Sequence, residues 1–135
     1  MKSKYLFHVL SLGFISLIVI FISCDDNIVD NNIDQMIIPS SNVSYSQHIQ
    51  PIFNAKCLGS GCHNDQDQAG NLSLTNWSET RTAVFPGLPG NSQLVWRIEG
   101  QGVAIMPPPT APVTPLTENH ITGIKKWIEE GAENN

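Results

Sequence analysis

The chain has 135 residues, 41% of them hydrophobic and 14% charged, which is enough for one small globular domain. Its net charge is −5. Without the two lysines near the N-terminus, 5 basic and 12 acidic residues remain and the net charge is −7. Because nucleic-acid phosphates require a basic protein surface, we expect no nucleic-acid partner. A basic protein partner is compatible with this charge.

The first 23 residues have the pattern of an export signal. Lys2 and Lys4 give a positive start, an apolar run follows, and Cys24 ends it directly before two acidic residues. The pattern is similar to a bacterial lipoprotein signal peptide, in which the cysteine is lipidated and becomes the first residue of the mature chain. An uncleaved membrane helix is the alternative, since a run of this length could just span a bilayer. In both cases we expect an extracytoplasmic domain, in the periplasm or at the cell surface, anchored to a membrane.

Residues 24–42 are rich in aspartate and asparagine and end in Pro39, Ser40, Ser41 and Asn42. Such a composition buries little surface, so we expect a lipidated N-terminus and a flexible linker before a domain at residues 43–135. Met36 lies in this segment, and we expect it to be a flexible side chain rather than a metal ligand.

An amphipathic helix is predicted over residues 47–56, with Ser46 as its N-cap. Pro51 should bend or loosen its first turns, because proline lacks a backbone N–H. His48 on this helix is expected to be partly exposed rather than a ligand. The apolar residues on one helical face are Tyr45, Ile49, Ile52 and Phe53.

Two thiols and an imidazole follow this helix within seven residues, Cys57-Leu58-Gly59-Ser60-Gly61-Cys62-His63. The usual attachment signature of a c-type haem has two cysteines separated by two residues and followed by histidine. In that chemistry the thiols add to the haem vinyl groups and the imidazole reaches the iron from one side. Here four residues separate the cysteines. They must bulge away from the porphyrin, and Gly59 and Gly61 accept the backbone angles of such a bulge.

The next residues, 64–71, form a polar loop. Asp65 and Asp67 alternate with amides, but the rest of a twelve-residue calcium loop is missing. We therefore predict a solvated turn rather than a metal site.

Two short helices are predicted further on. Asn76 should cap helical turns over residues 76–82, and Ser92 should cap a helix that ends near residue 98. Arg97 on the second helix has two interpretations of equal weight. Its guanidinium could pair with a carboxylate of a bound group in bidentate fashion, or it could lie on a solvated helix face.

Met106 is followed by three prolines. An iron centre that transfers electrons rather than binding gas needs a soft, neutral second axial ligand, which a thioether sulfur provides. The prolines restrict the backbone, so the sulfur could be held without ordering a mobile loop. A buried core methionine is the alternative. The cysteine and histidine motif upstream favours the ligand.

A last helix is predicted from Thr117, its N-cap, to Gly131, which ends it. Its apolar face should pack on the helix at residues 47–56. His120 in the first turn is expected to be exposed and to be at most a reserve ligand if Met106 is displaced. The apolar residues of this face are Ile121, Ile124, Trp127 and Ile128.

Together these stretches resemble a family of small monohaem cytochrome c domains of the Planctomycete type. The motif Ile-x-Pro-Ile-Phe ahead of the first cysteine is matched by Ile49, Pro51, Ile52 and Phe53. The motif Met-Pro-Pro…Trp-Ile-x-x-Gly-Ala is matched by Met106, Pro107, Pro108, Trp127, Ile128, Gly131 and Ala132. The resemblance covers roughly residues 43–132 and implies a mainly α fold, a small helical domain with long loops around a haem.

The resemblance also implies a function. One haem c would be bound covalently through Cys57 and Cys62, with its iron held by His63 and Met106. In the first of the two interpretations of Arg97, the bound group is this haem and the guanidinium faces a haem propionate. Such a protein passes single electrons to a redox partner protein. The sequence has no Ser-His-Asp set, acid pair or phosphate loop, so we expect no enzymatic activity.

Three alternatives stay open at this point. A haem-free lipoprotein binding module could close a Cys57–Cys62 disulfide, which an extracytoplasmic compartment permits. A zinc site of Cys57, Cys62 and His63 lacks an evident fourth ligand. A haem enzyme such as a peroxidase needs an open iron position, and Met106 argues against it.

Overall fold

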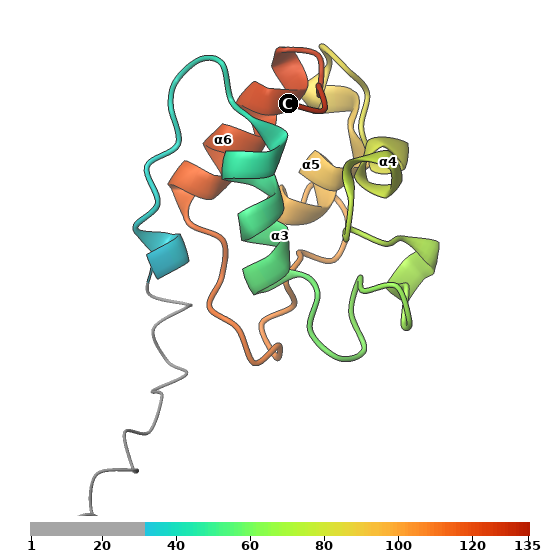
Figure 1. Cartoon of the computed structure of the whole chain (residues 1–135). Coiled ribbons are helices and arrows are strands. Elements are labelled where there is room, and N and C mark those ends of the chain that lie inside the picture. Colours follow the sequence, from blue (N-terminus) through green and yellow to red (C-terminus); the bar gives the residue numbers. More distant parts are fainter. Residues whose placement is uncertain (1–31) are drawn as a thin grey trace, which may run out of the picture.

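The computed structural model describes residues 32–135, and in this range it contains helices and loops but no β-strand. The mainly α fold expected from the sequence is therefore confirmed. The expected signal peptide, Cys24 and the linker up to residue 31 lie outside the described residues. The helices are α3 (Gln50–Lys56), α4 (Trp77–Thr80), α5 (Gln93–Glu99) and α6 (Glu118–Glu129), joined by long loops (Figure 1). Shorter helical segments are η1 (Tyr45–Ile49), η2 (Ala69–Asn71), η3 (Arg81–Ala83) and η4 (Pro89–Asn91).

The first helical segment begins earlier than predicted. A π-helical turn, η1, precedes α3, and Ser44 rather than Ser46 caps it by accepting a hydrogen bond from the Gln47 N–H at 3.2 Å. Ser44 has the extended backbone of an N-cap residue, which aims its hydroxyl at the first turn. Pro51 lies in the first turn of α3, directly after the π-helical turn.

Helix α6 has the ends that the sequence predicts. The Thr117 hydroxyl accepts from the His120 N–H at 3.2 Å, and His120 Nδ1 accepts from the Thr117 N–H at 3.3 Å. This reciprocal pair satisfies two backbone donors at the helix start. Gly131 follows the helix with a φ of 108°, in the region that favours glycine.

One hydrophobic core joins α6 to η1 and α3. Tyr45 and Trp127 pack with their ring centroids 5.3 Å apart, a distance typical of favourable aromatic contacts. Burial of the apolar side chains of this core is the main favourable contribution to the stability of the domain. The core members from the two predicted faces are Ile49, Ile52, Phe53, Ile124, Trp127 and Ile128, each with at most 1% of its surface exposed.

The prediction that His120 is exposed was wrong. Its side chain is fully buried, and Nε2 lies 2.9 Å from the backbone oxygen of Ile33. Because that oxygen can only accept, Nε2 carries the proton and Nδ1 is free to accept from Thr117. The error has a physical cause, since the side chain is covered by a segment that we expected to be a linker.

Residues 33–43, which we call the N-terminal strap, pack on the domain instead of forming a flexible linker. In Figure 1 the strap, in cyan, runs beside α6. Glu130 accepts from the N–H groups of Asn42 and Val43 at 2.9 and 2.8 Å, and Asn119 Nδ2 donates to the Met36 oxygen at 2.7 Å. The strap's apolar side chains supply the reason, because Ile33 is buried and Met36 and Ile38 pack against the core. Residues 33–42, which we expected to be part of a linker, therefore belong to the packed structure.

None of the helices in residues 32–135 has the length and apolar composition needed to cross a bilayer.

Candidate functional site

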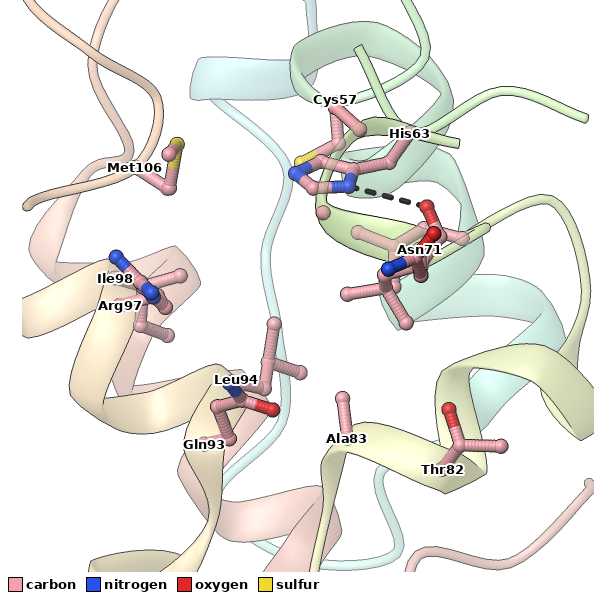
Figure 2. Close-up of a pocket in the computed structure, with 14 residues that line it drawn as sticks. Cys57, His63, Asn71, Thr82, Ala83, Gln93, Leu94, Arg97, Ile98 and Met106 are labelled. Carbon is pink, nitrogen blue, oxygen red and sulfur yellow. Dashed lines mark hydrogen bonds between the residues drawn. The ribbon is translucent and has the colours of Figure 1, made fainter. Parts of the chain in front are cut away.

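A cavity of about 270 Å³ opens between the chain that follows α3 and helix α5 (Figure 2). Much of its wall is aliphatic, from Leu72, Leu74, Ala83, Leu94 and Ile98. Four residues predicted from the sequence also line it, namely Cys57, His63, Arg97 and Met106. The fold thus brings together residues that lie up to 49 positions apart in the chain.

Cys57 stands at the end of α3. Its N–H donates to the Phe53 oxygen at 2.8 Å, which continues the helical pattern by one residue. The Cys57 oxygen in turn accepts from the His63 N–H at 3.0 Å. This bond closes the loop between them, and Figure 2 shows the Cys57 sulfur beside the imidazole ring.

Two contacts with the following extended segment fix the orientation of His63. Its Nδ1 lies 3.2 Å from the Leu72 oxygen, and its own backbone oxygen accepts from the Leu74 N–H at 2.8 Å. Since a carbonyl oxygen can only accept, Nδ1 carries the proton and Nε2 keeps its lone pair. In Figure 2 this second nitrogen is turned toward the side of the cavity where Met106 lies. A backbone acceptor on one ring nitrogen is the usual support of a histidine that ligates metal through the other.

Met106 faces the cavity from the loop after α5. Its N–H donates to the Arg97 oxygen at 2.8 Å, so the loop is bound to the last turn of that helix. Figure 2 shows Met106 across the cavity from His63, with Arg97 near it. His63 and Met106 are both partly buried. The cavity therefore has a thioether on one side and an imidazole on the other.

Cys62 is the predicted site residue that does not line the cavity. It is partly exposed, and its Sγ lies 3.7 Å from the Ser60 oxygen. Cys57 and Cys62 are both free thiols in the structure. Burial raises the pKa of Cys57 to about 12, and nearby Cys62 acts in the same direction while Lys56 opposes it. Cys57 is therefore protonated at neutral pH.

The polar loop after His63 is more ordered than the predicted solvated turn. Asn64 Oδ1 accepts from the N–H groups of Gln66 and Asp67, both at 2.9 Å. Asp67 Oδ2 accepts from Asn64 Nδ2 at 2.8 Å and from the Gly61 N–H at 2.7 Å. The hydrogen bond from Asn64 lowers the pKa of Asp67, and the one from the Gly61 N–H lowers it to a smaller extent. The sequence offered a hint of this order, because an asparagine side chain often hydrogen-bonds the backbone two residues further on. It did not show that Asn64 and Asp67 also bind the loop before His63.

Asp65 points the other way along the chain. Its Oδ1 accepts from the hydroxyls of Thr75 at 2.6 Å and Ser73 at 2.8 Å, and these bonds lower the pKa of Asp65. The two aspartates thus bind two different segments, one on each side of His63.

The other candidate ligands lie elsewhere. His48 Nδ1 accepts from the Ser44 N–H at 2.9 Å, and His120 is buried under the N-terminal strap. Met36 also belongs to the strap and not to the cavity wall. In the part of the chain that the structure describes, no three His, Cys, Asp or Glu residues are grouped as a metal site, which leaves the zinc alternative without a ligand set.

Residues 59–110 match the sequence model of a family described as Planctomycete cytochrome C. This segment contains Cys62, His63, Arg97 and Met106. The chain has a cytochrome c-like domain. No curated protein and no solved structure matches the chain.

A cytochrome c-like domain implies a covalently bound haem with its iron, and the residues around the cavity fit that group. The His63 imidazole has an unused ring nitrogen, and the Met106 thioether lies across from it. These are the donor types that hold iron in electron-transfer haem proteins. Cys57 stands at the same cavity, and the aliphatic wall suits a flat apolar ring.

Proposed function

We propose that this protein is an extracytoplasmic electron carrier with one haem c. Cys57 and Cys62 would bind the haem covalently, and His63 and Met106 would hold its iron. The observation that carries the proposal is that Cys57, His63 and Met106 line one cavity. A match to a cytochrome family over residues 59–110 supports the same proposal.

The haem would supply a one-electron change at its iron, and the surrounding residues would decide what that iron does. His63 would bind through Nε2, because the Leu72 oxygen holds the proton on Nδ1. Met106 would hold the iron together with His63, and its neutral sulfur would favour the reduced state and keep water and gases from the iron. A haem held in this way would supply electron transfer.

The cavity wall supports this role. The side chains of Leu72, Leu94 and Ile98 make part of it apolar and limit the access of water. Arg97 lies beside Met106 at the same cavity, where its guanidinium would pair with a carboxylate of the haem. Such a pair would offset the negative charge of the haem propionates in this acidic chain.

We propose no catalytic activity for the protein itself. It would exchange electrons with a redox partner protein, and its net charge of −5 favours a partner with a basic docking surface. Lipidation of Cys24 would keep the domain outside the cytoplasm and anchored to a membrane.

Haem attachment can be tested on the full chain, produced with a cytochrome c maturation system. After denaturing electrophoresis, we expect a band that stains for haem, because a thioether-bound haem survives denaturation. Replacing both Cys57 and Cys62 by serine should abolish the stain. A colourless wild-type band whose mass is two hydrogens lower would instead establish the disulfide of the alternative binding module.

A further inference from the structure

We propose that Asn64 and Asp67 are positioning residues for Cys62. Their side chains fix the loop between the two cysteines, so that the Cys62 thiol is presented to the haem together with His63. This inference rests on the proposed function, because it concerns how the second thioether bond is made. We call the contacts of these two side chains the Asn64–Asp67 clamp.

The clamp binds the loop at two points. Asp67 Oδ2 accepts from the N–H of Gly61, the residue directly before Cys62, at 2.7 Å. Asn64 Nδ2 donates to the Gly59 oxygen at 3.0 Å and to Asp67 Oδ2 at 2.8 Å. One amide group therefore bridges the middle of the loop and the carboxylate that holds its end.

Backbone hydrogen bonds also restrain this loop, but none of them uses the Gly61 N–H. The Cys57 oxygen accepts from the His63 N–H, and the Cys62 N–H donates to the Gly59 oxygen, each at 3.0 Å. The peptide between Ser60 and Gly61 has its N–H satisfied by Asp67. Without the clamp the Gly61 N–H, directly before Cys62, would lose its protein acceptor and depend on water.

The sequence of the loop explains why it needs external support. Four residues separate the cysteines where the usual signature has two, and two of the four are glycines. Glycine loses more conformational freedom on ordering than other residues do, so a loop with Gly59 and Gly61 is costly to hold in one shape. Gly61 has a φ of 76°, which requires glycine there. The hydrogen bonds of the clamp offset this loss of freedom.

The position of Cys62 makes the clamp relevant to attachment. A Cβ on Gly59 would lie 3.7 Å from Cys62 Sγ, so the thiol rests over the same glycine that Asn64 holds. Cys57 already lines the cavity, whereas Cys62 lies just outside it. Addition of the Cys62 S–H across a vinyl double bond forms one S–C bond and moves the hydrogen to the other vinyl carbon. That reaction depends on how often the loop places the sulfur within reach.

The test compares Asp67→Ala with Asp65→Ala in the full chain, purified from cells that have the maturation system. Both variants remove one carboxylate from the same exposed loop. Asp65 binds Ser73 and Thr75 and makes no contact with the loop between the cysteines. In Asp67→Ala we expect the ratio of doubly to singly attached haem to fall roughly threefold to tenfold, the range for the net loss of one typical hydrogen bond. Peptide mass mapping gives this ratio, and the absorption of the haem in alkaline pyridine reports a remaining vinyl group.

A second measurement does not depend on attachment chemistry. Hydrogen exchange of the Gly61 amide should become faster in Asp67→Ala by a similar factor and stay unchanged in Asp65→Ala. Asp67→Glu keeps a carboxylate and should recover part of both effects. If Asp67→Ala and the wild type have equal attachment ratios and equal Gly61 exchange rates, Asp67 does not position Cys62. A wild-type chain that takes up no haem would overturn the proposed function, and this inference with it.

Discussion

Asp34 Oδ1 lies 3.0 Å from Lys56 Nζ, and this ion pair joins the N-terminal strap to the last residue of α3. The Lys56 side chain is fully buried, and that of Asp34 is 26% exposed. Thr114, in the loop that follows Met106, donates to Asp34 Oδ2 at 3.0 Å and accepts from Lys56 Nζ. The strap, the end of α3 and the loop after Met106 therefore meet at one polar contact.

Replacing Asp34 by asparagine should lower the free energy of unfolding by about 1–3 kcal/mol, because the buried Lys56 ammonium loses the nearby negative charge of Asp34. Urea unfolding at neutral pH measures the change. As a control, Glu129→Gln removes an exposed carboxylate that lies 3.0 Å from Lys126 Nζ, and it should leave the free energy of unfolding nearly unchanged. Equal effects of the two substitutions would contradict a structural role for the Asp34–Lys56 pair.

The effect of Asp34→Asn should also depend on pH. Burial alone would raise the pKa of Asp34, but hydrogen bonds from Lys56 and Thr114 and the charge of Lys56 lower it overall from 3.8. The folded chain thus binds fewer protons at this site than the unfolded chain, so the contribution is present above pH 3.8 and is lost as the pH falls below it. The difference between wild type and Asp34→Asn should shrink in that acidic range. A constant difference down to pH 2 would rule out the ionised carboxylate as its source.

Gly123 allows the strap to lie close to α6. A Cβ at this position would come within 2.7 Å of two carbons of the Ile38 side chain. Gly123→Ala should therefore destabilise the domain by about 1–2 kcal/mol, since Ile38 must move. In an Ile38→Ala background the same substitution should stabilise by about 0.5–1 kcal/mol, because alanine favours the helix. A double-mutant cycle measures this coupling, and additive effects would show that the strap does not pack on Gly123.

Met106→Ala should abolish the weak near-red absorption band that sulfur-to-iron ligation gives in the oxidised protein. Met36→Ala is the matched control, because it removes a thioether that lies in the strap and not at the cavity. We expect the band to persist in that variant. If the band survives in Met106→Ala, Met106 is not the ligand.

The Cys57 thiol should react slowly with iodoacetamide in the haem-free folded chain. Burial raises its pKa from 9.0 to about 12, so at pH 8 its thiolate fraction is roughly 1,000-fold lower than in the unfolded chain. Its labelling rate should rise about tenfold per pH unit up to pH 11, as followed by peptide mass mapping. The chain denatured in urea provides the comparison, and equal rates in both forms would contradict the burial of Cys57.

The same shift predicts a loss of stability in alkali. Between pH 9.0 and about 12 the folded chain keeps a proton on Cys57 that the unfolded chain has lost. The contribution of the Cys57 thiol to the free energy of unfolding is therefore constant below pH 9.0, and it falls as the pH rises toward 12. Cys57→Ser in the haem-free chain should flatten this part of the stability profile.

The helices could be predicted because their signals are local. Thr117 and Asn76 cap helices as expected, and the apolar spacing from Ile124 to Ile128 placed the buried face of α6 correctly. Ser44 was missed because Ser46 offers the same hydroxyl two residues later, and only the tertiary structure decides between them.

The contacts between distant segments could not be predicted from the sequence. In the sequence, His120 is a polar residue near the start of a helix, a position that is usually exposed. The neighbouring residues do not indicate that the Ile33 oxygen lies 2.9 Å from its ring. The strap itself looks like a linker, because it belongs to a stretch rich in aspartate and asparagine that ends in proline and serines. The partners of Asp67 were hidden for a related reason, since the Gly61 N–H approaches it only after the loop has closed.

The packed strap also sets how far the domain could stand from a membrane. If Cys24 carries the lipid, residues 25–32 connect it to Ile33, which is buried in the fold. Eight residues extend to at most about 28 Å, roughly the thickness of the hydrocarbon core of one bilayer. The haem would then travel in a thin layer above the lipid headgroups. Electron donors and acceptors would have to reach into that layer, so integral membrane proteins and neighbouring lipoproteins would meet it more often than freely diffusing partners.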